Sequence, residues 1–146
     1  HTTARKLFDD IVNQKKFGIP VIFEYVLDEL FTTLGNKHPF DYVRSVVDFI
    51  LLNIEQNVFS LVMLDGRDAL YGAVKLFKKL NENGTSFLSF TDCAIIFSML
   101  KNDITYLASF DSGFSKVLDK FEEGIYILRD HKKRELERIL VRPFGN

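Results

Sequence analysis

The sequence predicts an α/β fold, a three-layer α/β/α sandwich built on a mostly parallel sheet. Segments in which apolar residues recur at helical spacing alternate along the chain with short apolar runs that are typical of buried strands. Strands that are separated by helices favour a parallel sheet covered on both faces. With 146 residues and no repeat, low-complexity tract or linker, the chain is predicted to form one domain over residues 1–146.

The first half of the chain is predicted to hold three amphipathic helices and two strands. Gly18 and Pro20 should end the first helix, and Gly35 with Asn36 should end the second, because both residue pairs are typical helix stops. In chain order we expect a helix over 2–16, a strand over 20–23, helices over 24–34 and 40–55, and a strand over 58–64.

The second half is predicted to continue the alternation around one central helix. Asp65 should cap a helix that runs to about Asn81. Residues 91–101 are almost wholly apolar, so this helix should be buried. Strands are expected over 104–109 and 125–128, and a charged terminal helix over 130–140.

Composition excludes several classes of function. The net charge of −1 gives no global attraction to nucleic acid, so any such binding needs a local basic patch. The single cysteine, Cys93, is expected in the core; it excludes an intramolecular disulfide and favours a reducing, cytoplasmic setting. No apolar run reaches about 18 residues, so we expect no membrane span. The scattered glycines form no phosphate-binding loop, and the three histidines lie in polar or terminal stretches.

Carboxylates at element ends are the candidate functional groups. Glu29 lies early in a helix that follows a strand, Asp92 opens the buried helix, and Asp111 lies just past a strand. In a parallel sheet these positions share one edge, where the three acids would form one pocket. Three negative charges in one pocket repel one another, so the pocket needs a cation to neutralise them. Ligands that are all oxygen atoms favour Mg²⁺ or Mn²⁺ over zinc.

Each acid also has a simpler interpretation. Asp92 could only cap its helix, and Asp111, in an Asp-Ser-Gly sequence, could only form a turn. Glu29 could be a solvated residue near a helix start. A basic run at residues 131–138 could face RNA, but Glu135 and Glu137 interrupt it, so an ordinary solvated helix face is the simpler interpretation.

Three segments resemble the PIN domain family, especially toxin ribonucleases of the virulence-associated protein C type and their archaeal relatives. VIFEYVLDELFTTL (21–34) resembles the family's second strand and the helix that holds its glutamate, here Glu29. LSFTDCAIIFSM (88–99) resembles the third acidic motif, with its aspartate at Asp92. YLASFDSGF (106–114) resembles the strand and motif that supply a fourth acid, here Asp111.

The resemblance implies a metal-dependent endoribonuclease that hydrolyses RNA phosphodiester bonds, like the toxin of a toxin–antitoxin pair. It assigns Mg²⁺ or Mn²⁺ to Glu29, Asp92 and Asp111, and the hydroxyl groups that could support these acids belong to Thr91, Ser109 and Ser112. It also implies a homodimer and an antitoxin partner.

The family's first motif, a strand that ends in an aspartate, has no counterpart in the sequence. We expect that strand upstream of residue 1. If its acid is truly missing, the alternative is a catalytically inactive PIN-like module that binds a partner or acts as a scaffold.

Overall fold

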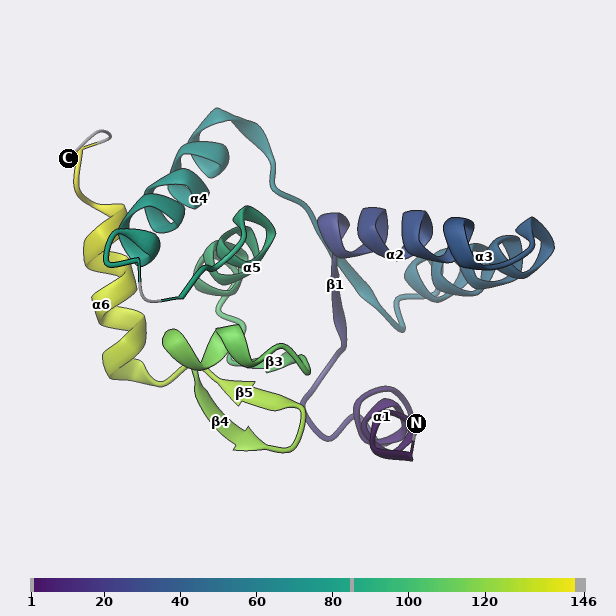
Figure 1. Cartoon of the computed structure of the whole chain (residues 1–146). Helices are drawn as coiled ribbons and strands as arrows, with labels where there is room; N and C mark the ends of the chain where they lie inside the picture. The colour runs from purple at the N-terminus through teal and green to yellow at the C-terminus, as the bar shows by residue number, and fades with distance from the viewer. Residues whose placement is uncertain (1, 85, 144–146) are drawn as a thin grey trace. The chain divides into compact units, whose positions relative to one another are not determined.

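The computed structural model has a mixed α/β structure and describes residues 2–84 and 86–143 (Figure 1). The chain divides into two units, His1–Met63 and Leu64–Asn146. Within the part of the chain that the structure describes, the first unit is mainly helical with one pair of strands, and the second holds three α-helices, a short 3-10 helix and a small sheet. Among the described residues, no helix is long and apolar enough to cross a lipid bilayer.

The first unit follows the predicted order of elements. Its α-helices are α1 (Thr2–Phe8), α2 (Glu24–Lys37) and α3 (Phe40–Glu55), and its strands are β1 (Val21–Phe23) and β2 (Ser60–Val62). The two strands pair in parallel over their whole length. The predicted parallel pairing is therefore confirmed for this pair.

Two helix boundaries in this unit differ from the prediction. The first helix does not reach residue 16: it changes at Asp9–Asn13 into a short π-helix, η1, and Lys15 has a φ of 51°, which a regular helix cannot accommodate. Helix α2 runs through the predicted stop at Gly35 to Lys37. It ends there because Pro39 disfavours helical angles at the preceding residue, and His38 is extended.

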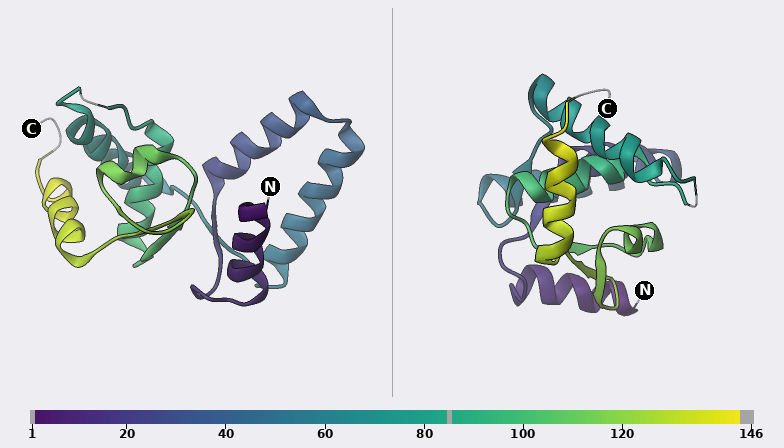
Figure 2. Two further views of the ribbon diagram at one scale, coloured as in Figure 1. Left: turned by 60° about the horizontal axis from the view of Figure 1, so that its bottom comes forward. Right: turned by 90° about the vertical axis from the view of Figure 1, so that its left-hand side faces the viewer.

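The second unit is built around a buried helix. Helices α4 (Gly66–Asn81) and α5 (Phe90–Lys101) pack together, and α6 (Asp130–Leu140) also packs against α4 (Figures 1 and 2). Seven of the twelve residues of α5 are buried, so the prediction of a buried helix is confirmed. Gly72 allows the close approach of α4 to α5, because a Cβ atom there would collide with the ring of Phe97.

The sheet of the second unit corrects the prediction of parallel strands. Strands β3 (Tyr106–Ala108), β5 (Ile125–Ile127) and β4 (Asp119–Glu122) lie in the order β3–β5–β4, and both neighbouring pairs are antiparallel. No crossover helix separates β3 from β5: only a short 3-10 helix, η2 (Ser112–Lys116), and β4 lie between them. Gly124, with a φ of 78°, lies in the tight turn that joins β4 to β5.

Candidate functional site

Asp92 lies in the first turn of α5 and takes part in a capping box. The hydroxyl of Ser89, the residue that caps the helix, accepts a hydrogen bond from the backbone N–H of Asp92, at 3.0 Å. In return, Oδ2 of Asp92 accepts the backbone N–H of Ser89, at 3.1 Å. This reciprocal pair satisfies two N–H groups at the helix start and leaves Oδ1 of Asp92 outside the box. The capping interpretation of Asp92 is therefore confirmed, and one oxygen is left for another ligand.

The loop before α5 is held by the end of α4. The side-chain amide of Asn81 donates to the backbone oxygens of Phe77 and Leu88, both at 2.9 Å. Its Oδ1 accepts the N–H of Leu88, at 2.8 Å. Asn81 thus fixes the backbone of Leu88, one residue before the helix cap. Apart from an Asn at a helix end, no sequence pattern indicates this positioning role.

Asp111 caps the short helix η2 and is held by several hydrogen bonds. Its Oδ1 accepts the backbone N–H of Gly113, at 2.8 Å, and its own N–H donates to the hydroxyl of Ser109, at 3.0 Å. The hydroxyl of Tyr126 donates to the Asp111 backbone oxygen, at 3.1 Å. The turn interpretation of Asp111 is confirmed as well. Its side chain is exposed, and Oδ2 lies outside these hydrogen bonds.

The predicted supporting hydroxyl groups have different roles. Ser109 supports Asp111, but through the backbone N–H and not through the carboxylate. The recorded hydrogen bond at Ser112 uses its backbone oxygen, which accepts the Ser115 hydroxyl at 2.7 Å. Within residues 86–143 the structure shows no hydrogen bond from Thr91 or Ser112 to either aspartate carboxylate.

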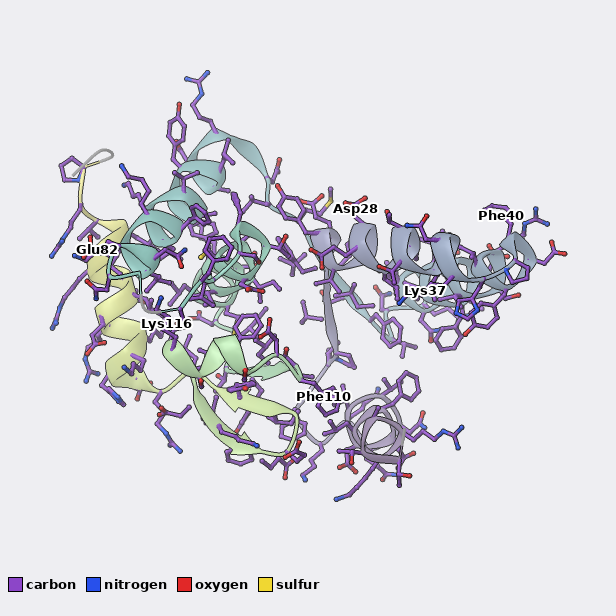
Figure 3. The ribbon with its side chains drawn as sticks, viewed as in Figure 1. Asp28, Lys37, Phe40, Glu82, Phe110 and Lys116 are labelled. Carbon is purple, nitrogen blue, oxygen red and sulfur yellow. The ribbon has the colours of Figure 1, made fainter. Side chains whose placement is uncertain are left out.

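The starts of α5 and η2 belong to neighbouring segments of the second unit. Gly113 faces the loop before α5, because a Cβ atom on Gly113 would lie 3.8 Å from Cδ2 of Leu88. Lys116, labelled in Figure 3, ties the same two segments together: its Nζ donates to the backbone oxygen of Ser86, at 2.7 Å. The loop that leads into the Asp92 cap therefore lies against the turn that follows Asp111.

The electrostatics around Cys93 report two opposite charges near the start of α5. Burial, which is the largest cause, and the negative charge of Asp92 raise the pKa of the Cys93 thiol, the positive charge of Lys116 lowers it, and the net result is a pKa of about 12. The side chain of Cys93 has no exposed surface, which confirms that it is a core residue. Lys116 therefore places a positive charge near Cys93, in the first turn of α5. Sequence reasoning missed Lys116, because its partner Ser86 is 30 positions away.

Glu29 lies in the first unit, on the exposed surface of α2, next to Asp28, which Figure 3 labels. Its convergence with Asp92 and Asp111 stays a prediction. Across residues 2–84 and 86–143, no group of three or more His, Cys, Asp and Glu side chains is placed to hold a metal ion.

The two aspartates of the second unit have the chemistry that a hard divalent cation requires. Oδ1 of Asp92 and Oδ2 of Asp111 are carboxylate oxygens that the helix caps do not use. Such oxygens are the usual protein ligands of Mg²⁺ and Mn²⁺. The comparisons with known proteins add no assignment: no protein-family model, curated protein or solved structure matches this chain.

Proposed function

We propose that the chain is a PIN-like, metal-dependent endoribonuclease with Glu29, Asp92 and Asp111 as its metal ligands. The observation that carries this proposal is the placement of two carboxylates at the starts of α5 and η2, on segments that lie against each other. One oxygen of each carboxylate accepts a capping hydrogen bond, and the other oxygen takes no part in the cap and would bind the ligand. A structural cap needs only the first oxygen, so the second is available for chemistry.

The chain's own residues would share the work of binding and orienting the substrate. Asp92 and Asp111 hold their carboxylates in fixed directions, because the capping hydrogen bonds restrict both side chains. Lys116 supplies a positive charge near the start of α5, which would attract a phosphate oxygen. Bound Mg²⁺ or Mn²⁺ would activate a water molecule and neutralise charge on the phosphate.

The proposal includes the three-layer α/β/α arrangement; its parallel part is the pair β1–β2, whereas the sheet of the second unit is antiparallel. The parallel pair β1–β2 supports it, because α2 follows β1 directly and carries Glu29 near its start. In parallel sheets, ligands bind beyond the carboxyl ends of the strands, where such helices begin.

The proposal extends to the setting in which the enzyme acts. We propose a cytoplasmic homodimer that is the toxin of a toxin–antitoxin pair. Helix α3 supports a protein contact, because Tyr42, Phe49 and Leu52 lie on one side of the helix and are 51%, 49% and 50% exposed. Large apolar side chains on one helix are typical of a surface that a partner covers.

A catalytically inactive PIN-like binding module is the second candidate. The observation that favours it is that the capping box of Asp92 and the turn of Asp111 account for both residues without any metal. In that case the carboxylates would only stabilise the starts of α5 and η2.

Metal dependence separates the two candidates. We expect the protein to cut an unstructured RNA in the presence of Mg²⁺ or Mn²⁺, and to stop when EDTA removes the metal, because the carboxylates alone cannot activate water. Gel analysis of an end-labelled RNA measures the cleavage, and a DNA of the same sequence serves as the control. An RNA that stays intact with either metal while it binds the protein would support the inactive module instead.

A further inference from the structure

We propose that Arg134, Arg138 and Arg142 form a phosphate-binding row that holds the backbone of single-stranded RNA along α6. The identity of the ligand rests on the proposed function, whereas the row itself rests on the geometry of the second unit. The row lies outside the candidate acid site and would bind RNA without cleaving it.

The basic side chains of the terminal helix fall into two groups. Two lysines are paired with acids. Nζ of Lys132 lies 3.9 Å from Oε2 of Glu135, and Nζ of Lys133 lies 2.8 Å from Oδ1 of Asp103. The three arginines are exposed, and none of them forms an ion pair with any residue in the described part of the chain. The neighbouring acids thus neutralise the two lysines, and the three arginines remain available to bind phosphate.

The three arginines occupy one side of the helix. They recur every four residues, so they lie about 6 Å apart along the helix axis. Val141 keeps helical angles, with φ −81° and ψ −9°, so Arg142 continues the row beyond Leu140. The three positions therefore span about 12 Å in a line.

The opposite side of the helix is attached to α4. Leu136, two residues from both Arg134 and Arg138, is about 200° around the helix from each and is buried. Lys75 of α4 donates a hydrogen bond to the backbone oxygen of Leu140, at 3.0 Å. The attachment of the apolar side to α4 leaves the arginine row facing solvent on a rigid element.

The row is a local positive feature on a nearly neutral chain. Residues 130–142 carry five basic and three acidic side chains, hence a charge of +2, whereas the whole chain carries −1. Guanidinium groups bind phosphate through two parallel N–H donors, and their regular spacing suits a polyanion with a repeating charge. At about 3.4 Å per stacked nucleotide, the row would cover three to four phosphates.

The simpler explanation is that these positive charges stabilise the helix by interacting favourably with its dipole. It applies to Arg138 and Arg142, which lie near the C-terminal end of α6, and would contribute about 0.3 to 1 kcal/mol each. It does not apply to Arg134, in the middle of the helix. The two explanations predict different effects when the arginine charges are removed. The dipole explanation predicts a change in helix stability alone, whereas the phosphate-binding row predicts a loss of RNA affinity.

The test compares two triple variants that lose the same charge. The first is Arg134→Gln, Arg138→Gln and Arg142→Gln. The control is Lys79→Gln, Lys120→Gln and Lys132→Gln, three lysines of the same unit that pair with Glu82, Glu123 and Glu135. Fluorescence anisotropy measures the Kd of a labelled uracil RNA of about 20 nucleotides in EDTA, from about 0.05 to 0.3 M salt.

We expect the arginine variant to bind at least about tenfold more weakly at low salt, with the slope of log K against log salt reduced by about 2, while the lysine control stays near wild type. An equal loss of RNA affinity in both variants, or wild-type affinity in the arginine variant, would contradict the proposed phosphate-binding row. Equally tight binding of polyglutamate to the row would show that its ligand is an acidic protein and not RNA.

The same proteins with Mg²⁺ separate this proposal from the proposed function. If the row is wrong but the function is right, the arginine variant binds RNA normally and wild type still cuts. If the function is wrong but the row is right, wild type binds RNA through the arginines and cuts nothing.

Discussion

We expect Asp92→Asn to reduce Mg²⁺-dependent RNA cleavage at least about 100-fold, because an amide keeps the shape of the side chain but loses the charge that holds a cation. The fold should persist, since the amide oxygen can still accept the backbone N–H of Ser89. In metal-free buffer the free energy of unfolding should change by less than about 1 kcal/mol. Loss of favourable charge at the helix start is offset by reduced repulsion among the acids.

Ser89→Ala is the matched control, because it breaks the same capping box without touching a carboxylate. The hydroxyl of Ser89 accepts the N–H of Asp92, so its removal should destabilise the protein by about 1 kcal/mol. Cleavage by the folded variant should stay near wild type. Paired measurements of the melting temperature and the cleavage rate give the answer: unchanged cleavage in Asp92→Asn, or unfolding of that variant, would leave Asp92 with a capping role only.

Leu76→Ala should cost about 3 kcal/mol, within a range of about 2 to 5 kcal/mol, which is the largest stability effect we expect. Leu76 has no exposed surface and lies in α4, which packs against both α5 and α6. Removal of its side chain would leave a cavity in the core of the second unit. Urea denaturation followed by circular dichroism measures the loss.

Leu70→Ala provides the comparison for this core substitution. Leu70 lies in the same helix but is 43% exposed, so the same chemical change there should cost well under half as much. If the two variants were equally stable, the packing of α4 in the core of this unit would be wrong.

The sequence predicts best those elements whose signal is local. Helix α5 was predictable because its residues are apolar on nearly every side. Its cap at Ser89 was missed, although Ser89 and Asp92 stand at capping-box spacing. Strand β4 was missed, since three of its four residues are charged and only the turn at Gly124 marks the hairpin. The antiparallel pairing was missed for a different reason. Strands separated by helices are expected to run parallel, but no long helix lies between β3 and β5.

The candidate site divides in the same way. The capping role of Asp92 and the turn role of Asp111 follow from residues within three positions in the sequence, so both could be predicted. Lys116 and Asn81 were missed, because their roles depend on contacts that only the folded chain makes. Hydrogen bonds across 7 or 30 positions leave no periodic pattern in the sequence.

The central claim is that Glu29, Asp92 and Asp111 bind one cation together. Titration with Mn²⁺, followed by backbone amide NMR, tests this directly, because the unpaired electrons of the ion broaden the resonances of nearby nuclei. We expect the amides of these three residues to broaden together at the first additions, and this effect to disappear in Asp92→Asn. Broadening that is scattered over exposed acids such as Asp28, or that spares Glu29 while it affects the two aspartates, would contradict the shared site.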